Sequence, residues 1–165
     1  MNGPVVKESI VRVADWAAAR GDEALVTLGL GSCVAIMLHD PQVGAGAMAH
    51  VLLPSRSLAR DTSNPAKFPE TAVPFLIEQL RALGADPRRV VAKLAGGASM
   101  FAQLMMPGSV QMGERNLAAT RNALRAAAIP LAGEAVGGEA GRSVRFYVAD
   151  GRVEIRSVGA DVFCI

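Results

Sequence analysis

The sequence predicts a single mixed α/β domain over residues 1–165, with its sheets covered by two longer helices. The length suits one domain with a sizeable core, and 51% hydrophobic against 19% charged residues is typical of a globular chain. Most apolar segments are short and bounded by glycine or proline, as strands are. Two longer segments repeat apolar residues at helical spacing, which predicts the helices.

The first third of the chain consists mostly of short apolar segments separated by turn residues. The segment 14–20 is rich in alanine, which favours a short helix, and Gly21-Asp22 predicts a turn after it. The residues from Asp40 to Gly44 predict a hairpin connection between the apolar segments on either side. The strands expected in this part are 10–13, 24–27, 34–38 and 45–53.

The remainder of the chain combines two predicted helices with further strands. The polar segment 54–69 is expected to be an exposed loop. Helical spacing from Val73 to Leu83 predicts a helix, with Pro74 in its first turn and Gly84 as its C-terminal cap. A second helix begins at Gly113 and is ended by a proline at position 130. The remaining expected strands are 90–94, 131–136, 144–148 and 153–155, the last two forming a hairpin.

Cys33 is the residue best suited to chemistry, because it follows a glycine-rich stretch and precedes an apolar strand. A thiol at such a turn is held rigidly and remains reachable. The predicted hairpin brings His50 to the same end as Cys33, where an imidazole can activate the thiol as a nucleophile. Backbone N–H groups around Gly31, Ser32 and Cys33 are the natural donors to an oxyanion. Thr27, six positions earlier, is a weak candidate for orienting the imidazole.

Other interpretations of the same residues stay open on composition alone. A cysteine in an apolar stretch is more often a small core residue, and a histidine in a strand is more often structural. A zinc site formed by Cys33, His39 and His50 would lack a fourth ligand and the usual ligand spacing. The stretch 29–34 lacks the third glycine and the helix of a dinucleotide-binding fingerprint. We therefore expect neither a metal nor a cofactor.

The charge and the cysteine content favour a cytoplasmic protein that does not bind nucleic acid. The net charge is +2, and the basic residues are scattered rather than clustered. The first residues lack the layout of a signal peptide, and no apolar run is long enough to span a bilayer. The two cysteines, Cys33 and Cys164, are expected to be reduced in the cytoplasm, although a disulfide between them is possible on paper.

Five stretches of the chain, in this order, resemble the chemoreceptor glutamine deamidase family CheD. The first two, which carry the glycine–serine–cysteine and histidine–apolar–proline blocks, are the most specific. The region 67–73 and both termini are more divergent. The similar stretches are TLGLGSCVAIMLHD (27–40), MAHVLLP (48–54), KLAGGASMF (93–101), GERNLAATRNALRAAAIP (113–130) and GGEAGRSVRFYVADGRV (137–153).

The resemblance implies a protein-glutamine deamidase that uses no cofactor and has Cys33, His50 and Thr27 as its catalytic residues. A thiolate–imidazolium pair of Cys33 and His50 would convert receptor glutamines to glutamate, with ammonia release, through a thioester. Some methylesterase activity on receptor glutamates is implied as well. The implied fold is that of toxin deamidases, a cysteine hydrolase fold with mixed β-sheets sandwiched between helices.

The resemblance also implies partners in chemotaxis. The substrate would be the cytoplasmic part of methyl-accepting chemotaxis receptors, whose modification regulates adaptation. The regulatory partner would be the phosphatase CheC, docking over the active-site face, and Phe101 in the GGASMF loop is a candidate part of that surface. The alternative function is a non-catalytic regulatory module that binds CheC.

Overall fold

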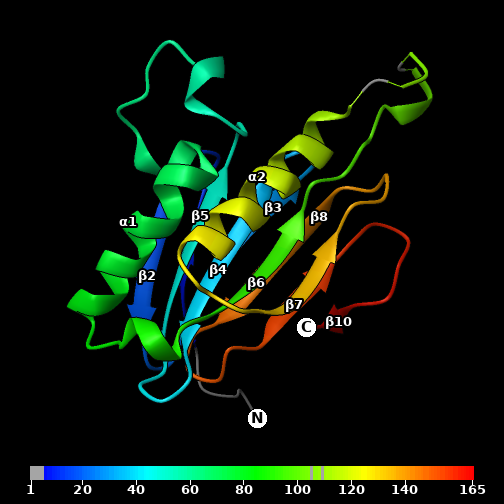
Figure 1. Ribbon diagram of the computed structural model, residues 1–165. Coiled ribbons are helices and arrows are strands. Elements are labelled where there is room, and N and C mark those ends of the chain that lie inside the picture. The colour runs from blue at the N-terminus through cyan, green and yellow to red at the C-terminus, as the bar shows by residue number, and fades with distance from the viewer. Residues whose placement is uncertain (1–5, 105, 109) are drawn as a thin grey trace.

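Two five-stranded sheets stack face to face, and both longer helices cover the outer face of one of them (Figure 1). The computed structural model describes residues 6–104, 106–108 and 110–165. The helices are α1 (Pro69–Ala82) and α2 (Met112–Ala126), with short 3-10 turns η1 (Arg56–Leu58), η2 (Pro65–Lys67), η3 (Pro87–Arg89) and η4 (Ala102–Leu104).

The sheet that lies away from the helices is called sheet A, and the sheet beneath them is called sheet B. Both are mixed, because each contains one parallel pair of neighbours among antiparallel ones. Sheet A has the order β1 (Lys7–Ile10), β3 (Glu23–Leu30), β8 (Arg142–Tyr147), β9 (Val153–Arg156) and β10 (Phe163–Cys164). Sheet B has the order β2 (Trp16–Arg20), β5 (Ala45–Val51), β4 (Val34–Asp40), β6 (Val91–Gly96) and β7 (Leu131–Val136).

Sheet B separates two apolar layers. Leu38, Leu76 and Leu94 lie in the layer between sheet B and the helices. Leu25 and Met37 lie in the layer between the two sheets. Because sheet B is covered on both faces, every residue of its central strand β4 is buried, which explains the unbroken apolar run in that part of the sequence.

The predicted mixed α/β class is confirmed, and the structure adds the order of the layers. Both helices lie on the same side of sheet B, and sheet A closes the other side. The outer face of sheet A carries charged side chains, among them Glu8 and Arg145, which form an ion pair, and Arg156. Such a face can contact water directly, so it needs no helix to cover it.

The predicted helix over 14–20 is wrong, because residues 16–20 form strand β2 and residue 14 lies in the turn before it. The strand pairs antiparallel with β5, with Trp16 opposite Ala49. Ala17 and Ala19 face the layer between the sheets, whereas Trp16 packs edge-on against Phe75 of α1, 4.8 Å between ring centroids. Apart from Arg20, both faces of the strand are apolar, and three consecutive alanines follow Trp16, so the sequence shows no alternation that would have indicated a strand.

Several other boundaries differ from those predicted, and three of them bear on the site or on the edges of the fold. Helix α1 begins at Pro69, so Pro74 lies inside the helix rather than in its first turn, whereas Gly84 follows the helix with a φ of +91°, as expected of a C-terminal glycine. Strand β3 extends through Gly29 to Leu30, which shortens the predicted glycine loop to 31–33. The first strand is Lys7–Ile10 rather than 10–13.

Candidate active site

Cys33 lies in a three-residue loop, 31–33, that carries the chain from β3 in sheet A to β4 in sheet B. The side chain is half-buried and its thiol is free. All three carbonyl groups of the loop accept hydrogen bonds, while none of its three N–H groups has an acceptor within the described residues. The donors are the Ala98 N–H to Gly31, the Asn116 amide to Ser32 and the Gly97 N–H to Cys33, at 2.9, 2.9 and 2.8 Å.

Glycines allow the backbone of neighbouring elements to approach this loop closely. Gly96 has a φ of +102°, and a Cβ atom there would lie 2.2 Å from the Cys33 carbonyl oxygen. A Cβ atom at Gly113, the second residue of α2, would lie 2.5 Å from the Gly97 and Ala98 carbonyl oxygens. Side chains at these positions would push the end of β6 and the start of α2 away from the Cys33 loop.

His50 faces the layer between the sheets, on the same side of sheet B as Cys33. It lies opposite Ala35 in the β4–β5 hairpin, and paired residues of neighbouring strands share a face. Side chains alternate along a strand, so Cys33, two residues before Ala35, is the diagonal neighbour of His50. The hairpin predicted from the sequence is therefore confirmed, and it places both residues at the same end.

Thr27 approaches His50 from the opposite sheet. Its Oγ1 lies 2.8 Å from His50 Nδ1 and 2.6 Å from the Val11 carbonyl oxygen. The carbonyl can only accept, so the Thr27 hydroxyl donates its hydrogen to Val11 and must accept from a protonated Nδ1. The neutral imidazole therefore carries its hydrogen on Nδ1, and Nε2 is left with a free lone pair.

No hydrogen bond joins His50 to Cys33 in this structure. His50 is 1% exposed, and its Nε2 atom has no hydrogen-bond partner within the described residues. Diagonal neighbours on a sheet lie about 7–8 Å apart at the backbone, a separation within the reach of long and aromatic side chains. The structure thus joins Thr27 to His50 directly and brings Cys33 only to the adjacent position.

Burial favours the neutral forms of both groups. Desolvation raises the pKa of the Cys33 thiol above 9.0, although the residue's own backbone N–H acts in the opposite direction. Desolvation also lowers the pKa of His50 below 6.5. The expected thiolate–imidazolium pair is therefore not the resting state of the free protein, because at neutral pH both directions favour a thiol beside a neutral base.

A pocket of about 430 Å³ opens in front of Cys33. Gly31, Ser32 and Cys33 line it on one side, and the start of α2 lines it on another. Phe101 belongs to the same pocket with 68% of its surface exposed, so the aromatic ring lies at the entrance to the thiol rather than in the core.

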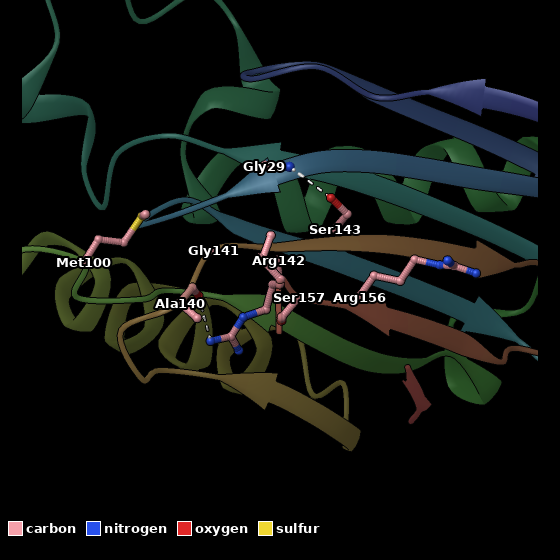
Figure 2. Close-up of a pocket in the computed structure, with 9 residues that line it drawn as sticks. Gly29, Met100, Ala140, Gly141, Arg142, Ser143, Arg156 and Ser157 are labelled. Carbon is pink, nitrogen blue, oxygen red and sulfur yellow. Dashed lines mark hydrogen bonds between the residues drawn. The ribbon is translucent and has the colours of Figure 1, made fainter. Parts of the chain in front are cut away.

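A larger pocket of about 620 Å³ lies beside the first and does not include Cys33 among its lining residues. Figure 2 shows Met100 at one end of this pocket and the hydrogen bond between the Gly29 N–H and Ser143 Oγ. The two heavy atoms of this bond are 3.3 Å apart. Met100 lines both pockets, and its sulfur would lie 3.0 Å from a Cβ atom at Gly31. The methionine side chain therefore forms the partition between the two spaces.

The second histidine lies away from this site. His39 is at the other end of β4, opposite Gly46, and its Nε2 lies 2.8 Å from the Val148 carbonyl oxygen. Cys164 is an exposed free thiol on β10. Within residues 6–104, 106–108 and 110–165, no group of three potential ligands is positioned to hold a metal ion. No helix in the same ranges is both long and apolar enough to cross a membrane.

Sequence reasoning missed Asn116, whose amide donates to the Ser32 carbonyl. The residue lies 84 positions from Ser32, in the first turns of α2. A polar residue near the start of a predicted helix ordinarily indicates capping or solvent exposure. Complete burial of Asn116 beside the loop 31–33 is a consequence of tertiary packing that no local pattern predicts.

A thiol, an imidazole whose tautomer is fixed and a buried hydroxyl are the functional groups of a cysteine hydrolase. The family model for CheD, described as CheD chemotactic sensory transduction, matches residues 52–157, and the chain belongs to this family.

Curated relatives match over nearly the whole chain. A probable chemoreceptor glutamine deamidase CheD from Caldanaerobacter subterraneus subsp. tengcongensis is 39% identical over 95% of this chain and 98% of its own. The chemoreceptor glutamine deamidase CheD of Thermotoga maritima is 40% identical over 92% and 93%. A solved structure, the hypothetical protein YfiH of Bacillus licheniformis, aligns with a TM-score of 0.43 at 14% identity, over 79% of this chain and 60% of that one.

Proposed function

We propose that this protein is a glutamine deamidase of chemoreceptors, in which Cys33 attacks the side-chain carboxamide of a receptor glutamine. The observation that carries the proposal is the Thr27–His50 hydrogen bond, because it leaves Nε2 of the imidazole as a proton acceptor on the face that holds Cys33. Relatives named chemoreceptor glutamine deamidase support the substrate.

The first half of the reaction forms a thioester. The substrate carboxamide enters the pocket, the Cys33 proton passes to His50 Nε2, and sulfur bonds to the carboxamide carbon. The carbonyl oxygen gains negative charge, and the unpaired N–H groups of Ser32 and Cys33 are the donors closest to the reacting sulfur along the chain. The imidazolium then returns the proton to the nitrogen, the carbon–nitrogen bond breaks, and ammonia leaves.

The second half returns the enzyme to its starting state. His50 takes a proton from water, the resulting hydroxide attacks the thioester, and the carbon–sulfur bond breaks as the thiolate regains the proton. The product is a glutamate side chain. A glutamate methyl ester would react by the same steps, with methanol as the leaving group.

Intact-mass spectrometry of a purified chemoreceptor, with ammonia measured in parallel, tests this proposal. The wild-type protein is expected to raise the receptor mass by the exchange of NH₂ for OH and to release one ammonia per exchange. Cys33→Ala is expected to do neither, and Cys164→Ala, which removes the exposed thiol, is the matched control. Equal receptor mass after wild-type and Cys33→Ala treatment would remove the proposal, and cleavage of the receptor chain would replace it with proteolysis.

We further propose the phosphatase CheC as a regulatory partner that covers the pocket at Phe101, and a cytoplasmic location. The exposed Phe101 ring, the half-exposed Met100 and their position at the pocket of Cys33 support a surface at which a partner would exclude substrate. Two free thiols support a reducing compartment. A purely regulatory, non-catalytic function is not favoured, because such a function would not require a buried imidazole with a fixed tautomer.

Phe101→Ala is expected to weaken binding of CheC, measured by titration calorimetry. Leu104→Ala is the matched control, because Leu104 is 83% exposed three residues away but does not line the pocket. Equal losses for the two variants would contradict docking at the pocket entrance.

A further inference from the structure

We infer that Asn116 is a positioning residue that aims the backbone N–H of Cys33 at the oxyanion formed during the reaction. The inference rests on the proposed function, because it concerns the loop 31–33 that carries Cys33, here called the nucleophile loop. Asn116 lies on α2, is fully buried, and directs its side chain at the backbone of that loop.

The planar peptide group between Ser32 and Cys33 links the Asn116 amide to the Cys33 N–H. Asn116 Nδ2 donates to the Ser32 carbonyl at 2.9 Å. That carbonyl and the Cys33 N–H belong to one planar trans peptide and point in opposite directions, so an atom that holds the carbonyl also sets the direction of the N–H. A carbonyl that accepts a hydrogen bond also polarises its peptide group, which makes the N–H a stronger donor.

The same amide ties the nucleophile loop to the strand that carries the base. Asn116 Nδ2 also lies 3.3 Å from the Leu52 carbonyl oxygen, and Leu52 follows His50 by two residues. One NH₂ group therefore contacts the peptide beside Cys33 and the backbone just beyond His50. This bridge fixes the position of the loop that carries the thiol relative to the strand that carries the imidazole.

The cost of keeping an amide at this position indicates that its donors are needed. Asn116 Oδ1 is buried and has no hydrogen-bond partner within the described residues. A buried acceptor without a partner destabilises the folded state, and an apolar side chain of similar volume would avoid that loss. The glycine at position 113 allows α2 to approach the loop closely enough for the amide to reach it.

The test compares reactions of Cys33 that need an oxyanion site with one that does not. Deamidation develops negative charge on oxygen, and so does the addition of Cys33 to a peptide whose glutamine side chain is replaced by an aldehyde. In that addition sulfur bonds to the carbonyl carbon and the thiol proton ends on the oxygen. Alkylation by iodoacetamide displaces iodide from carbon and develops no oxyanion, so it reports only the thiol.

Asn116→Leu is expected to lower kcat for deamidation and affinity for the aldehyde by about tenfold or more, a smaller effect than complete removal of an oxyanion donor. KM and the iodoacetamide rate at Cys33 are expected to stay within about twofold. Thr120→Val is the matched control, because Thr120 is equally buried on α2 and donates only to the Asn116 backbone carbonyl. If Asn116→Leu does not fold, Asn116→Ala removes both amide donors with a smaller side chain and no new polar group.

Each outcome decides the inference. Equal kcat and aldehyde affinity for Asn116→Leu and Thr120→Val would overturn it, and so would a fall of the iodoacetamide rate in parallel with kcat. A wild-type protein that binds the aldehyde more tightly than Asn116→Leu but releases no ammonia would leave the positioning role and remove the deamidase. A wild-type protein that binds no aldehyde would overturn the positioning role.

Discussion

Thr27→Val tests the hydrogen bond between Thr27 and His50, because it removes the hydroxyl while keeping the shape of the side chain nearly constant. In the wild type this hydroxyl accepts from His50 Nδ1 at 2.8 Å and donates to the Val11 carbonyl at 2.6 Å. Valine can do neither. The variant leaves one buried donor and one buried acceptor unpaired, since His50 and Val11 are each 1% exposed.

The two lost hydrogen bonds set the size of the effect. A buried polar group left unpaired costs about 1–3 kcal/mol, so for two such groups the free energy of unfolding is expected to fall by roughly 2–6 kcal/mol. The imidazole also loses its preference for hydrogen on Nδ1, a bias of about 1 kcal/mol that corresponds to roughly a fivefold change in population. Loss of ring orientation adds to this, and we expect kcat to fall by about tenfold to a hundredfold.

Ammonia release under substrate saturation gives kcat, and nitrogen NMR of the imidazole reports which ring nitrogen carries hydrogen. Thr27→Ser keeps the hydroxyl and is expected to retain both the Nδ1–H tautomer and most of kcat. A wild-type imidazole protonated on Nε2 would refute the tautomer deduced from the Val11 carbonyl. Serine and valine variants that lose activity equally would refute the role of the hydroxyl.

Two further predictions follow from charge and burial. Burial lowers the pKa of His50 below 6.5. The acidic limb of the pH profile of kcat/KM, where the base becomes protonated, is therefore expected to lie below pH 6.5. A limb above that value would contradict the neutral resting state of His50. The lowered pKa of His50 also makes the free energy of unfolding depend on pH. As pH falls below 6.5, His50 binds a proton more readily in the unfolded chain than in the folded protein, so the free energy of unfolding decreases. Arg89→Met is expected to lower the free energy of unfolding by about 3 kcal/mol in chemical denaturation, since it leaves the buried Asp40 carboxylate without its cation. Arg88→Met is the surface control and is expected to change this free energy by less than about 0.5 kcal/mol.

The sequence predicted the half of the site that is local. Two apolar segments joined by turn residues at 40–44 predicted that Cys33 and His50 share one end of a hairpin, and the register with Ala35 opposite His50 agrees. The segment 14–20 was misassigned, because an alanine-rich strand with two apolar faces shows no alternation of apolar and polar residues.

The other half of the site depends on contacts between elements that the sequence does not relate. Thr27 and His50 are 23 positions apart and meet only because the two sheets stack. Residue types alone gave Thr27 almost no weight, and the resemblance to CheD suggested it. Asn116 had no such support, since its partner Ser32 is 84 positions away and a helix must first pack against sheet B.

The placement of Thr27 depends on an irregularity at the end of β3. Leu25 and Thr27 both face sheet B, as residues two apart on a strand do, but Leu30 faces sheet B as well. The register against β8 shifts between Thr27 and Leu30, where Gly29 has a φ of +66°. This bulge turns Leu30 inward before the chain crosses to sheet B. Thr27 can therefore contact the imidazole while the loop that follows, only three residues long, places the thiol on the face that carries His50.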